Sequence, residues 1–120
     1  MSNIKSFALV FLLVFSLVGV NAIGKFYSND PVRVGEELEV LSVIRNPTSD
    51  DFENVNVKLF IYDLGIMIPT GSFDVDDGES KVARAYWKVP TSIRPGIYLA
   101  KLSVSNQDFR DSKHFYMTII

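Results

Sequence analysis

Apolar and polar positions alternate along most of the chain after residue 22, in short runs separated by turn-forming residues. The clearest run is Val55–Tyr62, whose odd-numbered residues are all aliphatic. A period of two is that of a strand with one buried face, and a helical period of 3.6 does not persist over a useful length. The pattern therefore predicts an all-β domain.

Clusters of Gly, Pro, Asn and Asp bound the runs at spacings of about 8–14 residues, as in all-β sandwiches and barrels. Pro69-Thr70-Gly71 is expected to stop one strand, and Asn106–Ser112 is expected to be a loop. Two antiparallel sheets around one core are the economical arrangement for about seven strands. The expected strand segments are Ile23–Tyr27, Leu38–Arg45, Val55–Tyr62, Ile66–Ile68, Phe73–Val75, Lys81–Val89, Ile97–Ser105 and His114–Ile120.

The run Leu38–Arg45 is apolar on both faces, since Leu41 and Val43 compete with Leu38 and Ile44 for the buried side. Such a strand is expected in the centre of a sheet, with its outer side covered by another sheet or by a partner.

Residues 1–22 have the three parts of a secretory signal peptide: a basic start that ends at Lys5, an apolar run from Ser6 to Val20, and small residues before Ala22. We predict an apolar signal helix cleaved after Ala22, which leaves residues 23–120 as one domain. The alternative is an uncleaved anchor that meets the membrane through residues 4–23. Either outcome predicts an extracytoplasmic domain, secreted or at the cell surface.

Composition excludes several kinds of function. The chain carries 12 Lys and Arg against 14 Asp and Glu, for a net charge of −2. This mildly acidic balance predicts no nucleic-acid binding. The sequence has no Cys, which removes disulfides, thiolate zinc sites, iron–sulfur clusters and a thiol nucleophile.

Several motifs carry a family likeness over most of residues 34–120. They are Gly35-Glu36-Glu37-Leu38, Val43-Ile44-Arg45-Asn46, Asn54-Val55-Asn56-Val57-Lys58-Leu59-Phe60-Ile61, Asp77-Gly78-Glu79-Ser80, Trp87-Lys88-Val89-Pro90, Pro95-Gly96-Ile97-Tyr98-Leu99 and Val104-Ser105-Asn106. With these motifs the chain resembles CARDB-like domains, the cell-adhesion-related, immunoglobulin-like modules of bacterial and archaeal surface proteins. The resemblance implies an immunoglobulin-like antiparallel β-sandwich, an adhesive or spacer role, and no catalytic residues. It transfers no ligand site.

The acidic run Asp74, Asp76, Asp77 and Glu79 is the one candidate for a metal site, because Ca²⁺ takes several oxygen ligands from a tight loop. The Asp-Gly pair within it is also a strong hairpin signal, so a solvated turn is the expectation and no cofactor is predicted. A second acidic group, at residues 50–53, could meet this loop at one end of a sandwich.

The sequence predicts that the protein is not an enzyme. His114 is the single histidine and has no partner motif for a triad or a metal site. It is expected at the surface or half-buried. Nucleophile-elbow, P-loop, zinc-protease and dinucleotide fingerprints are absent from the sequence.

Outward-facing aromatic residues are the candidates for a partner surface. Phe60, Tyr62, Tyr86 and Tyr116 fall on the polar sides of the expected strands. Together they could form an exposed patch that marks a contact surface, and the alternative is cross-strand aromatic pairing that stabilises the sheets.

Two loops are further candidates. Asn46, Pro47 and Thr48, together with Arg94-Pro95, resemble loops of the chagasin-type cysteine-protease inhibitors, although Asp50 and Gly96 depart from that pattern. The resemblance implies an alternative function, a small secreted binding or inhibitor-like protein that uses residues 46–51 and 94–96.

The main hypothesis is an exported, non-enzymatic structural or adhesion module that contacts other envelope or surface proteins. Its last expected strand ends at Ile120 without a polar tail. This favours an edge open to strand addition or to self-association.

Overall fold

A computed structural model describes residues 21–120. The predicted signal segment therefore lies outside the described residues, apart from Asn21 and Ala22. In the described range, no helix has the length and apolar character needed to cross a membrane.

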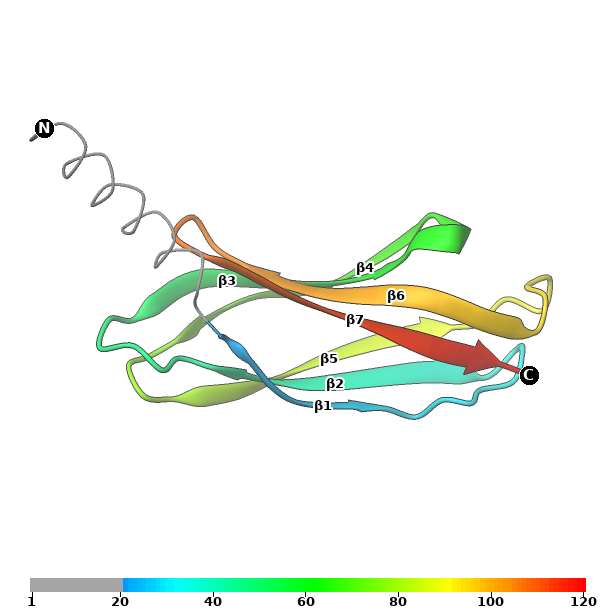
Figure 1. The fold of residues 1–120 in the computed structure, drawn as a ribbon, viewed down its shortest axis with the longest axis horizontal. Helices are drawn as coiled ribbons and strands as arrows, with labels where there is room; N and C mark the ends of the chain where they lie inside the picture. The colour runs from blue at the N-terminus through cyan, green and yellow to red at the C-terminus, as the bar shows by residue number, and fades with distance from the viewer. Residues whose placement is uncertain (1–20) are drawn as a thin grey trace, which may run out of the picture.

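The chain folds into two antiparallel sheets that pack face to face as the upper and lower layers of Figure 1. One sheet has the order β1-β2-β5 and the other the order β4-β3-β6-β7. The elements are β1 (Ile23–Ser28), β2 (Glu37–Arg45), β3 (Phe52–Ile61), the 3-10 turn η1 (Tyr62–Leu64), β4 (Ile66–Val75), β5 (Ser80–Lys88), β6 (Gly96–Ser105) and β7 (Arg110–Ile119). The all-β sandwich of seven strands expected from the sequence is confirmed.

Alternating aliphatic residues of both sheets fill the core. Val55, Val57, Leu59 and Ile61 of β3 are buried, as their period of two predicted. The core has two clusters, one around Val57 near the start of β1 and one around Leu59 nearer the C-terminus, with Phe26 packed against both.

The strand that is apolar on both faces, β2, is the central one of the three-stranded sheet. Leu38 and Ile44 of β2 are fully buried, whereas Leu41 and Val43 lie half-buried on the outer face. The strand is flanked by β1 and β5, so the prediction of a central position is correct.

Two segments differ from the sequence-based expectation. β4 continues through Pro69 and Gly71 as one strand with two register shifts, where a stop was expected. An edge strand tolerates proline because its outer N–H groups need no partner, and the φ of +93° at Gly71 suits glycine. β7 begins at Arg110, inside the expected loop, because Asn106 closes a tighter turn through its side-chain oxygen.

A third difference concerns the end of β7. Val32 pairs in parallel with Ile119, and the Val34 N–H donates to the Ile120 carbonyl at 3.2 Å. The segment after β1 thus crosses to the other sheet and covers the edge that was expected to be open at Ile120. Strand addition at that position is therefore blocked.

Tyr98 lies at a corner of the sandwich. Its hydroxyl donates to the carbonyl of Arg94, four residues upstream, at 2.5 Å. This is the geometry of a tyrosine corner.

Ser42 interrupts the buried face of β2 and gives a stability prediction. Its hydroxyl is buried and finds no hydrogen-bond partner among residues 21–120. Ser42→Ala is therefore expected to raise the free energy of unfolding by about 1 kcal/mol, because it removes an unpaired buried polar group. Urea unfolding measures this change, and Ser103→Ala on the outer face of β6 is the near-neutral control. A loss of stability in Ser42→Ala would mean that the hydroxyl is paired.

Candidate functional site

Aromatic side chains gather on the outer face of the four-stranded sheet, over the half nearer the C-terminus. Phe60 of β3 pairs with Met67 on one side and with Lys101 on the other, and Lys101 pairs with His114 of β7. Outward residues of paired strands share a face, so one row crosses all four strands. Tyr62 of η1 joins this row through its ring.

The rings and the cation in this row contact one another. Phe60 and Tyr62 lie 6.3 Å apart with planes inclined by 13°, and Tyr62 and His114 lie 6.3 Å apart with planes inclined by 16°. The Lys101 ammonium sits 5.5 Å from the Phe60 ring centre and 5.9 Å from that of Tyr62. These are cation–π distances, so Lys101 fixes the two rings on the sheet surface.

The patch is open to solvent at its rim. Tyr116, on the next row of β7, is 71% exposed, and Tyr62 and Met67 are about half exposed. We call this surface the aromatic face. Its residues are Phe60, Tyr62, Met67, Leu99, Lys101, His114 and Tyr116.

The predicted aromatic residues do not all meet. Phe60, Tyr62 and Tyr116 share the aromatic face, but Tyr86 lies on β5 and points outward from the opposite sheet. Tyr86 is about half exposed there. The four residues therefore form two surfaces rather than one.

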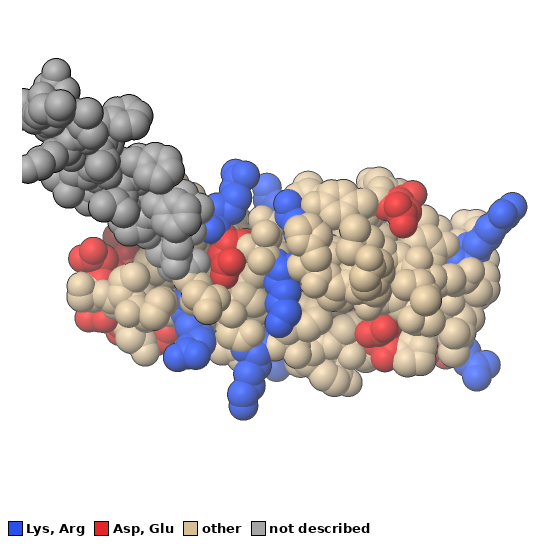
Figure 2. Space-filling view, viewed as in Figure 1, with Lys and Arg blue, Asp and Glu red and all other residues tan. Residues whose placement is uncertain are grey.

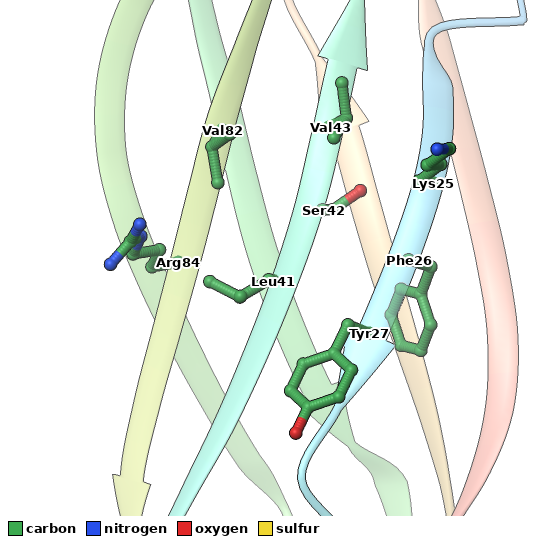
Figure 3. A pocket seen from close by; sticks show the side chains of 8 residues that line it. All are labelled: Lys25, Phe26, Tyr27, Leu41, Ser42, Val43, Val82 and Arg84. Atoms are coloured by element: carbon green, nitrogen blue, oxygen red, sulfur yellow. The ribbon is translucent and has the colours of Figure 1, made fainter.

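The outer face of the three-stranded sheet carries a hollow of about 350 Å³ (Figure 3). Lys25 of β1 and Arg84 of β5 lie on either side of it, with β2 between them. Its lining residues are Lys25, Phe26, Tyr27, Leu41, Ser42, Val43, Val82 and Arg84. Leu41 and Val43, which the sequence placed on a covered outer face, lie at its centre.

The candidate loop Asn46–Asp51 is built around a buried amide. Asn46 is 2% exposed, and its Nδ2 donates to the carbonyls of Asp50 at 2.6 Å and Val75 at 3.0 Å. Its Oδ1 accepts from the Thr48 N–H at 3.0 Å and the Thr48 hydroxyl at 2.7 Å. Asn46 thus holds the loop together. Of the three candidate contact residues in this loop, Pro47 is exposed, Thr48 is half-buried and Asn46 is buried.

The two inhibitor-like loops lie at opposite ends of the sandwich. Residues 46–51 follow the end of β2, whereas residues 94–96 precede β6 at the end where β7 finishes (Figure 1). One cleft cannot receive both loops. The geometry thus contradicts the alternative function that joins them.

The acidic turns meet at the end where the described chain begins, visible at the left of Figure 2. Asp51 Oδ1 accepts from the Asp77 N–H at 2.8 Å, so the two acidic groups do come together. Asp74 instead accepts from the Asn54 N–H at 3.0 Å. Within residues 21–120, no three His, Asp or Glu side chains are arranged to hold a metal ion. This applies to the candidate set of Asp74, Asp76, Asp77 and Glu79.

No family model matches the sequence, and no curated protein is similar to it in sequence. Solved structures do match the fold. A CARDB domain from Pyrococcus furiosus, crystallised in complex with di-metal ions, superposes with a TM-score of 0.63 at 16% identity, over 87% of this chain and 96% of that domain. The fold is CARDB-like.

Other solved structures share the CARDB-like arrangement. A Niemann-Pick type C2 protein from the Japanese carpenter ant gives a TM-score of 0.60 at 14% identity, over 82% of this chain and 91% of that chain. An alkylpurine DNA glycosylase of Pseudomonas fluorescens, bound to DNA with an abasic site analog, gives 0.61 at 13% identity, over 81% of this chain but 29% of its own length. At such identities the likeness is one of fold.

Sequence reasoning missed four members of the aromatic face on this CARDB-like sandwich. They are Met67, Leu99, Lys101 and His114, which were not assigned to the same surface as Phe60 and Tyr62. The missing signal was the order of the strands, because β3 and β6 are far apart in the sequence and become neighbours only through a long connection.

Proposed function

We propose that this chain is an exported, non-enzymatic module that contacts other envelope proteins through its aromatic face. The observation that carries the proposal is the exposed aromatic row over four strands, held by the Lys101 ammonium. Protein contact surfaces are enriched in Tyr and Phe and depleted in most charges at their centre. A contiguous exposed apolar patch with a polar surround is the usual mark of such a surface.

The position of the aromatic face supports a tethered or exported role. The described chain starts beside the end of β2, because Ile23 pairs with Ile44. Phe60 lies in the second-last pair of β3 and Tyr62 directly follows the strand, so both are in the half of the sandwich away from that start. A domain held at its N-terminus would present the aromatic face away from the point of attachment.

Site-specific photo-cross-linking in envelope fractions tests the proposal. A photoreactive phenylalanine at Tyr116 is expected to give a distinct and saturable cross-link to an envelope protein. The matched control is Ser112, which lies on the same strand and face in the polar half of the sheet. Tyr62→Ala in the labelled protein should weaken the contact, because buried Tyr anchors contribute more than about 1–2 kcal/mol. Equal cross-linking from both positions would contradict the proposal.

A further inference from the structure

The edges of the two sheets differ in how well they are protected. At β7, Asp30 Oδ2 accepts from the Thr118 N–H, and residues 32–34 pair with residues 118–120. At β4, Pro69, Gly71 and two register shifts break the edge. β1 is six residues long and has a register shift of its own. Proline, bulges and covering segments are the usual means of keeping an edge strand from pairing.

β5 lacks all of these devices. Its nine residues pair one by one with β2 without a register shift, and they include no Gly or Pro. Among the turn and loop hydrogen bonds of residues 21–120, none involves the backbone of residues 81–88. The outer edge of β5 is therefore a regular row of backbone donors and acceptors.

The register shows which groups face outward. Directly after β5, the Val89 N–H donates to the Glu36 carbonyl and the Val89 carbonyl accepts from the Gly35 N–H. Directly before β5, the Glu79 carbonyl accepts from the Asn46 N–H. The backbone N–H and C=O groups of an antiparallel strand point alternately to its two sides. Since residues 79 and 89 bond toward β2, the backbone groups of the odd-numbered residues of β5 also point toward β2. The N–H and C=O groups of Val82, Arg84 and Tyr86 then point to the free edge. The side chains of these residues lie on the outer face of the sheet, beside the hollow.

The charge along this edge is of one sign. Residues 80–88 contain Lys81, Arg84 and Lys88 and no Asp or Glu. A second copy of β5 would bring the same cations together with no acid on either strand, which opposes self-pairing. An acid opposite Arg84 and apolar residues opposite Val82 and Tyr86 would complement the edge instead.

We propose that β5 is a strand-addition site for an extended segment of a partner protein with an apolar-x-acid-x-apolar pattern. Backbone hydrogen bonds to residues 82, 84 and 86 would supply affinity, and the side chains beside Val82, Arg84 and Tyr86 would supply specificity. The inference rests on the proposed role in protein contact, but it uses the sheet opposite to the aromatic face.

A labelled peptide tests the site on the exported protein. Acetyl-Ser-Val-Thr-Glu-Thr-Val-Ser-amide carries the pattern in either strand direction, and its fluorescence anisotropy is expected to saturate below about 1 mM. The same peptide with an N-methylated Glu lacks the central backbone donor and is expected to bind at least about ten-fold more weakly. A Lys in place of its Glu should weaken binding as well.

Two variants probe the protein side. Arg84→Pro removes an outward N–H and leaves the bonds to β2 in place, so it should abolish binding without loss of fold. Arg84→Glu should reverse the preference, so that the Lys peptide binds better than the Glu peptide. If Arg84→Pro fails to fold, as judged by circular dichroism, the N-methylated peptide still tests the edge.

Other results would overturn the inference. They are equal binding of the N-methylated peptide, equal binding by a folded Arg84→Pro protein, no saturable binding to the wild type, or a dimer in light scattering that Arg84→Pro dissociates. Cross-linking from Tyr116 distinguishes the two proposals, because the β5 variants should leave it unchanged. If the protein binds the peptide but gives no cross-link from position 116, the aromatic-face proposal alone is wrong.

Discussion

Asn46→Ala is expected to lower the free energy of unfolding by about 3 kcal/mol, since it deletes a buried amide that makes four hydrogen bonds. The carbonyl of Val75 would lose its side-chain donor in a buried position. Chemical denaturation followed by tryptophan fluorescence measures the loss, with Trp87 as the single reporter.

Two further substitutions distinguish the hydrogen bonds that the Asn46 amide donates from those that it accepts. Asn46→Asp keeps the acceptor for Thr48 but places a carboxylate against the carbonyls of Asp50 and Val75, and should destabilise as much as Asn46→Ala. Thr48→Ala is the matched control and should cost about 1 kcal/mol. Wild-type stability in Asn46→Ala would contradict the structural role and return Asn46 to the candidate contact residues.

Asp111→Ala is expected to cost about 2 kcal/mol. Asp111 Oδ2 accepts from the backbone N–H groups of Ala22 and Ile23, both at 3.0 Å, and thereby fastens the start of β1 to β7. Hydrogen bonds to a carboxylate are stronger than neutral ones, and a partner left unpaired costs about 1–3 kcal/mol. Urea unfolding of the variant and the wild type gives the difference, and Ser112→Ala on the outer face is the control.

Signal cleavage would change the groups that Asp111 holds. In a chain cut after Ala22, the bond from the Ala22 N–H is lost, and the nitrogen of Ile23 becomes an α-ammonium next to the Asp111 carboxylate. The charged pair should offset the lost bond, so the cost of Asp111→Ala should stay at about 2 kcal/mol. Intact mass of the exported protein identifies the N-terminus. A loss below about 0.5 kcal/mol in either form would show that the carboxylate does not fasten the chain.

Strand positions followed from local pattern wherever one face is buried. The period of two in β3 and the turn residues on both sides of β5 fixed their location to within a few residues. The Asp-Gly pair at residues 77–78 marked the turn before β5, but that turn joins strands of different sheets, so the expected hairpin was wrong. The expected break at Pro69 was wrong because a proline breaks a central strand but not an edge one, and sequence alone does not say which strand is at the edge.

Surfaces were harder to predict than strands. The alternation showed correctly that Phe60 and Tyr86 point outward, but only the strand order places them on opposite sheets. Asn46 illustrates a second limit, because a turn asparagine that binds a partner and one that holds its own loop have the same sequence signal.

The parallel pairing of residues 32–34 with the end of β7 has a mechanical consequence. In Figure 1 the start of β1 and Ile120 lie at opposite ends of the sandwich. A pull on these two points loads the bonds Val32 N to Thr118 O, Ile120 N to Val32 O and Val34 N to Ile120 O along the strand direction. Bonds loaded in shear carry the force together and must break together, whereas bonds that are unzipped break one at a time. A module fixed at one end and gripped at the other would thus hold its shape under tension.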